Sequence, residues 1–214
     1  MTFRQLLTEF YARGFDYLND SGVGETRAKR WINQSYTDIC ESDDWPFLQS
    51  SFSGACPATI ADLGTVETVY NATQNRSMVF VDRRTLTETY PDLTLEGFPA
   101  YAYITNGTTV NTYPVSTTDV IKINYWEIPT DLAADSDSPV FPARYHQAII
   151  DYACGRAYID SDNPEMAQVA RGDADALVQL MRQRLLYQQH QDPDAIATYG
   201  FSTDGYGSSG PGTF

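Results

Sequence analysis

"CESDDWPFLQSSF" (residues 40–52) is the stretch at which the chain changes from helical to strand-like sequence. Acidic residues end an amphipathic helix, and Trp45-Pro46 then redirects the backbone, because the residue before a proline is restricted to extended geometry. Strand-type sequence begins at Phe47. The change is abrupt, and it indicates a β module inserted into a helical body, with Trp45, Pro46 and Phe47 as the hinge that sets the direction of the module.

Two helices are predicted before this stretch. Apolar residues recur at spacings of three and four over residues 3–18, which is the pattern of one buried helix face, and Thr2 with Gln5 fits a capping box at its start. Residues 19–25 have turn composition. A second helix is predicted from about residue 26 to residue 41, with Trp31, Ile32 and Tyr36 on its apolar face.

The second helix carries its bases at the end where a helix dipole favours acids. Arg27, Lys29 and Arg30 lie in its first turns, while Asp38 and Glu41 lie in its last. We therefore expect the three bases to have partners outside this helix, and they are the candidate subunit interface.

The region from residue 47 to residue 129 follows the pattern of short strands. Asn106-Gly107 predicts a tight hairpin, and residues 82–92 predict one or two helical turns. In VIKINYW (120–126), apolar and polar residues alternate up to Tyr125, so one face of this strand is expected to contact solvent or another protein surface. Five or six strands in this length predict a small antiparallel sandwich or partly open barrel.

Helical sequence returns after a polar linker at residues 130–142. Apolar residues from Tyr145 onward predict a third helix, and Asn163-Pro164 predicts the start of a fourth. Its expected apolar seam consists of Met166, Ala170, Ala174, Leu177, Met181 and Leu185. The predicted fold is thus α+β: a four-helix body with an inserted β module.

The last residues differ in composition from the rest. They are rich in Gly and Ser, contain no Lys or Arg, and carry spaced apolar side chains that cannot form a core of their own. A flexible docking arm and a tail without function are both open interpretations. The anchors of such an arm would be Ile196, Tyr199, Phe201, Tyr206 and Phe214. The predicted domain limits are 1–46, 47–138, 139–191 and 192–214.

The chain is strongly acidic, with a formal net charge of −14 over 214 residues. Phosphate binding needs clustered Lys and Arg, so this charge argues against capture of nucleic acid and against an anionic membrane surface. Aromatic residues make up 13% of the chain, including 15 Tyr. Tyr is favoured at protein interfaces, and a position on a sheet surface is an equally weighted interpretation of these residues.

No motif in the sequence indicates catalysis, a metal or a cofactor. Cys40, Cys56 and Cys154 lack metal-ligand spacing, which favours a reducing compartment. His146 and His190 lie on different predicted helices, and His146 is expected at the surface or in a cap. The carboxylates of Asp43-Asp44 and of Asp131, Asp135 and Asp137 lack the spacing of a calcium loop. Because no signal peptide and no long apolar run is present, we expect a soluble protein that is not exported. Because no catalytic motif is present, we expect that it is not an enzyme.

Two parts of the chain resemble the head-to-tail adaptor proteins of tailed bacteriophages, also called connector or head completion proteins. The first is LLTEFYARG (6–14) with TRAKRWINQSYTDICESDDWPFLQ (26–49), which gives two helices, an acidic turn and a W-P-F entry into strands. The second is the helical region 145–186, which contains the helix-turn-helix pattern "A…Y…NPE.A". The central region resembles that family only in consisting of β-strands.

The resemblance implies a structural virion protein in the neck of the particle, assembled in the host cytoplasm as a ring of typically twelve copies. Portal protein would bind on one side, through an arm at 192–214 that reaches the portal or neighbouring copies. The next component, a nozzle, stopper or tail protein, would bind on the other. Genomic DNA would pass through the ring without specific binding.

Two other classes of protein remain open from the sequence. A stopper or tail-completion protein of the same neck would share the acidity and the ring, although its body would be dominated by strands. A carbohydrate-binding module would need exposed aromatic stripes, for which the candidates are Tyr101, Tyr103, Tyr113, Tyr125 and Trp126.

Overall fold

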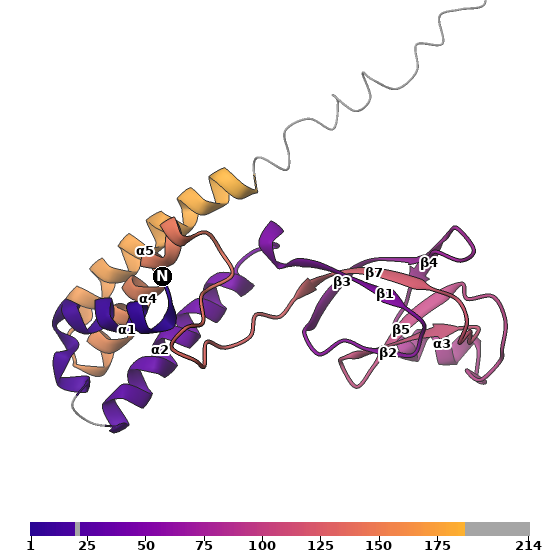
Figure 1. The fold of residues 1–214 in the computed structure, drawn as a ribbon, viewed down its shortest axis with the longest axis horizontal. Coiled ribbons are helices and arrows are strands. Elements are labelled where there is room, and N and C mark those ends of the chain that lie inside the picture. Colours follow the sequence, from indigo (N-terminus) through magenta and orange to yellow (C-terminus); the bar gives the residue numbers. More distant parts are fainter. Residues whose placement is uncertain (20–21, 187–214) are drawn as a thin grey trace, which may run out of the picture.

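The structure is a computed structural model and describes residues 1–19 and 22–186. A helical body and a β module lie one after the other along the long axis (Figure 1). The chain crosses from body to module near Trp45 and returns after residue 127. The chain is therefore α+β, as predicted, with the strands inserted between two sets of helices.

The first predicted helix is interrupted. Helix α1 (Phe3–Phe10) begins with the predicted capping box, in which Thr2 Oγ1 accepts from the Gln5 N–H and Gln5 Oε1 accepts from the Thr2 N–H. A π-helical turn follows at Tyr11–Phe15, then a 3-10 turn at Asp16–Leu18. The prediction of one helix over residues 3–18 was wrong because Gly14 has φ of 101°, a conformation that ends an α-helix.

Helix α2 (Gly22–Glu41) begins earlier than the sequence predicted. Part of the expected turn at residues 19–25 is helical, since Thr26 Oγ1 donates to the Gly22 carbonyl and Gly24 is buried. The predicted apolar face is confirmed: Trp31, Ile32 and Tyr36 are buried in the body core.

Helices α4 (His146–Asp160) and α5 (Pro164–Leu185) form a hairpin, with Asn163 capping α5 and Pro164 at its first position. They approach closely at Gly155, where a Cβ would lie 3.0 Å from Arg171 Cγ. The predicted seam of α5 was wrong in part, because the helix is rotated so that Met166 is exposed. Its buried residues are Ala167, Ala174, Val178 and Met181. The body thus contains the α-helices α1, α2, α4 and α5, of which α1 has only 8 residues.

The β module contains seven strands and one short helix. The strands are β1 (Gln49–Gly54), β2 (Ala58–Thr59), β3 (Leu63–Asn71), β4 (Arg76–Phe80), β5 (Tyr101–Thr105), β6 (Thr109–Tyr113) and β7 (Ile121–Glu127). Their order in the sheet is β1-β7-β3-β4-β5-β6-β2, and α3 (Arg83–Thr89) connects β4 with β5. Because β1 and β2 follow each other closely while pairing with opposite ends of the sheet, the sheet is nearly closed into a barrel.

The prediction of a wholly antiparallel module was wrong at one pair. β4 and β5 are parallel, since α3 and the following loop carry the chain back before β5 begins. The predicted hairpin joins β5 and β6, where Asn106 and Gly107 both have positive φ as a type I′ turn requires. The alternation in β7 is also confirmed: Ile121, Ile123 and Tyr125 are buried and the residues between them are exposed.

Candidate interaction surfaces

The hinge predicted at Trp45 is a packed junction. Trp45 has no exposed surface, and its indole Nε1 donates to the Ile39 carbonyl oxygen at 2.7 Å. Its ring stacks on Phe47 with centroids 5.6 Å apart and planes within 14°. The residue therefore sits in the body core and orients the chain that leaves it.

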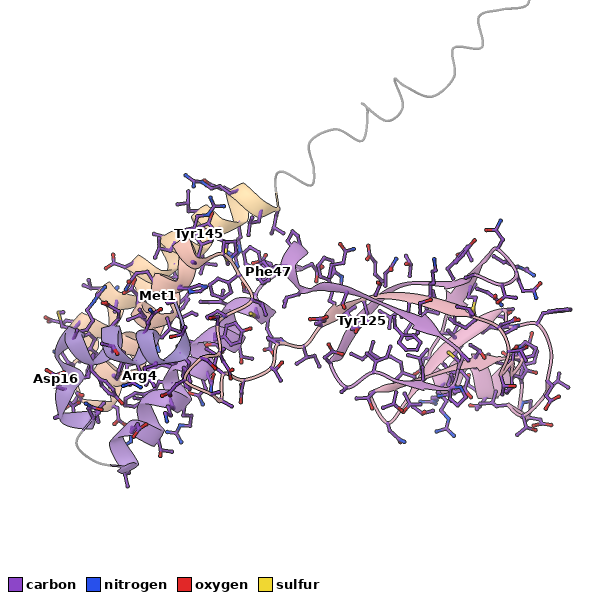
Figure 2. All side chains as sticks on the ribbon, in the orientation of Figure 1. Met1, Arg4, Asp16, Phe47, Tyr125 and Tyr145 are labelled. Carbon is purple, nitrogen blue, oxygen red and sulfur yellow. The ribbon has the colours of Figure 1, made fainter. Side chains whose placement is uncertain are left out.

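Pro46 begins a 3-10 turn, Pro46–Leu48, that leads into β1. Figure 2 shows Phe47 where the helical body meets the β module. Its ring lies 5.8 Å from that of Phe141, which belongs to the chain returning to the body. Trp126 of β7 is half-buried against the same body core. The outgoing and returning chains are thus both packed at the junction, so the direction of the β module is held by side-chain contacts.

The three bases of α2 differ in their surroundings. Arg27 pairs with Asp160 of α4 at 2.7 Å, as expected for a partner outside the helix, and Lys29 pairs with Glu25 of its own helix at 2.7 Å. Arg30 is exposed and makes no ion pair with the described residues. Both pairs are well exposed, and such pairs contribute little to stability.

Polar contacts tie α2, α4 and α5 together along the body. Asp38 of α2 pairs with Arg156 of α4, and Tyr152 of α4 donates to Asp175 of α5. At the end next to the junction, Arg182 Nε lies 2.5 Å from Asp43 Oδ2. This last pair holds the end of α5 beside the chain that enters the β module.

The sequence did not predict that two titratable residues, Asp151 and His146, are buried. Asp151 of α4 is buried, with Arg13 at 3.5 Å and Gln147 Nε2 donating to it at 3.1 Å, and burial raises its pKa. His146 was expected at the surface or in a cap. This was wrong, because its ring is buried beside Phe141 and the start of α4 has no side-chain cap. No sequence signal marks either residue, because both lie in a helix whose apolar and polar residues are not cleanly divided between two faces.

His146 has a defined tautomer. The Phe141 carbonyl can only accept, so His146 Nε2 carries the hydrogen and donates at 2.9 Å. Nδ1 then accepts from the Met1 ammonium group at 2.8 Å. Burial lowers the pKa of the imidazole, which keeps the ring neutral and makes it a structural hydrogen-bonding group.

The cysteines are poor nucleophiles. All three are buried free thiols, and desolvation raises the pKa of Cys40, Cys56 and Cys154 to about 12, 11 and 12. The thiolate, which is the reactive form, is therefore disfavoured near neutral pH.

Three of the loop carboxylates, those of Asp43, Asp135 and Asp137, bind other groups of the chain. Asp137 accepts the backbone N–H groups of Ala133 and Ala134, which lowers its pKa, and Asp135 pairs with Arg4. Within residues 1–19 and 22–186 no group of three or more potential metal ligands is present. In the same part of the chain, no helix has the length and apolar character needed to cross a bilayer.

The aromatic residues that made a carbohydrate-binding module a possible interpretation do not form an exposed stripe. Tyr103, Tyr113 and Tyr125 are buried, Tyr101 is half-buried beside Tyr90, and Trp126 packs on the helical body. Their alternation along the strands could not reveal this, because both faces of this sheet are partly covered.

The predicted anchors of the docking arm, Ile196, Tyr199, Phe201, Tyr206 and Phe214, lie outside the described residues. Their role remains a prediction from the sequence.

Comparison with protein families gives a match over nearly the whole chain. The family model described as "SU10 adaptor protein" matches residues 1–199, which includes the helical body and the β module. A search of curated proteins finds no match.

Proposed function

Because the chain belongs to the SU10 adaptor protein family of tailed-bacteriophage head-to-tail adaptors, we propose that its copies form a ring that joins the portal to the tail and surrounds the passage for DNA. Membership gives the chain a structural role in the neck of the virion. The ring, its typical number of twelve copies and its assembly in the host cytoplasm belong to the proposal.

The match over residues 1–199 is the observation that carries this function, since it spans the body, the junction and the β module together. The architecture supports it. An elongated subunit with a packed junction offers surfaces at both ends (Figure 1). In the proposal the body contacts neighbouring copies, and the β module faces the next neck component, which is a nozzle, stopper or tail protein.

The acidity of the chain supports a passage that does not retain DNA. Twelve copies carry 12 × −14, or −168, formal charges. Multidentate phosphate binding requires clusters of Lys and Arg, and each cluster would slow a moving duplex. An acidic wall repels the phosphates instead.

The bases of α2 contribute unequally to the proposed subunit contact. Arg27 and Lys29 already have partners within the chain, whereas Arg30 is exposed without one among the described residues. We therefore assign the contact with a neighbouring acidic copy to Arg30. Arg30→Glu should weaken ring formation while leaving the unfolding free energy of the monomer nearly unchanged, and Gln34→Glu, at an exposed position one turn later, is the matched control.

The arm at 192–214 is proposed to bind the portal through Ile196, Tyr199, Phe201, Tyr206 and Phe214. The decisive experiment is a mass measurement of the protein alone and mixed with its portal, for the full chain and for a chain ending at Gln191. We expect a ring on the portal with the full chain and weaker binding without the arm. Full binding by the shortened chain would overturn the arm assignment. If the full chain does not bind the portal when the portal is the only partner supplied, a stopper would be favoured instead of an adaptor.

A further inference from the structure

One long edge of the β module has no strand beside it. β1 pairs with β7 over six consecutive residues, from Gln49↔Trp126 to Gly54↔Ile121. The strand at the opposite end of the sheet is β2, which pairs with β6 at two residues and does not pair with β1, so the barrel stays open along β1. Within the described residues, the backbone groups of β1 that point away from β7 therefore have no strand partner (Figure 1).

This edge lacks the features by which soluble proteins protect an exposed strand. Its sequence, QSSFSG, contains no charge and no proline, and its pairing with β7 has no bulge. Natural edges usually carry a Lys, a Pro, a bulge or a covering segment. An unprotected edge with exposed Ser51 and Ser53 is receptive to an added strand.

The end of α5 lies beside the start of this edge. Arg182 pairs with Asp43, and Leu185 and Leu186 pack against the body core that also contains Leu48 and contacts Phe47. In Figure 1 the yellow end of α5 lies at the end of the body from which the chain passes into the β module. The remaining 28 residues of the sequence follow this end of α5.

One segment of those residues has the composition of a strand. AIATYGFST (195–203) lies between Asp194 and Asp204 and has no charge and no proline, and five of its nine residues are β-branched or aromatic. Residues 205–213, GYGSSGPGT, lack that character. The eight residues 187–194 can span about 26 Å when extended, and β1 is about 20 Å long, so the segment reaches the whole edge.

We propose that residues 195–203 add to the free edge of β1 of the same chain as an extra strand. Neither partner carries a charge, so no repulsion opposes the pairing, and the backbone groups of the edge obtain partners. This inference concerns the chain before it meets a portal, and it goes beyond the adaptor function. If the arm also binds the portal, the two contacts compete for Ile196, Tyr199 and Phe201.

Cysteine cross-linking of the purified chain without portal tests the pairing. Ser51→Cys is combined with a single cysteine at each position from 195 to 203, and the dilute protein is oxidised mildly. Native Cys40, Cys56 and Cys154 are buried thiols with raised pKa and give little background. We expect disulfides within one chain whose yield alternates with a period of two, because alternate residues of a strand face the same side.

The matched control combines Ser51→Cys with Ser209→Cys in the glycine-rich end of the same arm. Yields at 195–203 no higher than this control, or equal at all nine positions, would overturn the proposal. Cross-linked dimers in place of closed monomers would assign the edge to the arm of a second copy and overturn the pairing within one chain.

Hydrogen exchange provides a readout that needs no substitution. In the full chain, the β1 amides that point away from β7 should exchange slower, on the order of tenfold, than in a chain ending at Gln191. The amides of β4, a central strand, serve as the internal control and should not change. Equal exchange of β1 in both chains would contradict the pairing, whether or not the arm binds portal.

Discussion

The indole Nε1 of Trp45 donates to the carbonyl oxygen of Ile39 at 2.7 Å, across the end of α2. The last carbonyls of a helix have no partner within it, so a side chain that supplies one caps the helix. Trp45 does so from beyond the helix while its ring is fully buried. Trp45 thus shares the capping of α2 with Ser42, whose N–H and Oγ donate to the same carbonyl, and it also anchors the first turn of the chain that leads to the β module.

Removal of the Trp45 ring should destabilise the protein strongly. Trp45→Ala leaves a cavity in the body core and is expected to lower the unfolding free energy by about 3–5 kcal/mol, measured by urea denaturation. Trp45→Phe keeps most of the volume and removes one donor to the Ile39 carbonyl, which still accepts from the N–H and Oγ of Ser42, so its cost should be only about 0.5–1.5 kcal/mol. Phe98→Ala, at a 75% exposed aromatic of the β module, is the control and should change stability by less than about 0.5 kcal/mol. A Trp45→Phe protein as stable as the original would show that the hydrogen bond contributes nothing.

Much of this fold could be predicted because its signals are local. The capping box of α1, the Pro at the start of α5 and the Asn106-Gly107 hairpin each depend on residues adjacent in sequence. The parallel pairing of β4 with β5 depends on how α3 returns the chain, which strand composition does not encode. The exposure of Met166 likewise depends on the rotation of α5 against α4.

The interaction surfaces could be predicted less completely. The change of direction at Trp45-Pro46 follows from proline sterics, whereas the burial of Trp45 and its stacking on Phe47 are tertiary contacts. The unusual charge order of α2 correctly indicated a distant partner for Arg27. It could not indicate that Lys29 pairs within its own helix or that Arg30 is exposed.

The same substitution should have opposite effects at two glycines. Gly14 has φ of 101°, where an alanine is strained although no atom lies within 4 Å of its Cβ, so Gly14→Ala should cost about 1–2 kcal/mol. Gly172 lies inside α5, is exposed and has equal room for a Cβ, so Gly172→Ala should stabilise by about 0.5–1 kcal/mol. Thermal unfolding of both variants beside the original protein measures the difference. Shifts of the same sign would contradict the conformational explanation.

Asp151 should make the body less stable as the pH rises. Burial is the main cause that raises its pKa, Asp173 adds to it, and Gln147 and Arg13 oppose it. A carboxyl with a raised folded pKa contributes stability that is complete below the ordinary value of 3.8 and is lost as the pH rises through the folded pKa. Relative to the original protein, Asp151→Asn should therefore gain stability progressively as the pH rises from 3.8 through the folded pKa, measured by urea denaturation at several pH values.

Arg13→Gln is the matched test of the charge partner. Arg13 lowers the pKa of Asp151, so its removal should raise that pKa further and move the loss of stability to higher pH. A parallel pH dependence for Arg13→Gln, Asp151→Asn and the original protein would show that Asp151 titrates in the folded state as it does in the unfolded chain.

His146 should have the opposite pH dependence. Burial lowers its pKa below the ordinary 6.5, so the stability it contributes is complete above pH 6.5 and is lost as the pH falls through the folded pKa. Protonation would place a second hydrogen on Nδ1, which accepts from the Met1 ammonium group, and would leave a charge in the core. His146→Gln should be less stable than the original protein at neutral pH because the ring packing on Phe141 is lost, yet its stability should fall less steeply below pH 6.5. Equal slopes for the two proteins below pH 6.5 would mean that the buried imidazole does not cause the acid sensitivity of the body.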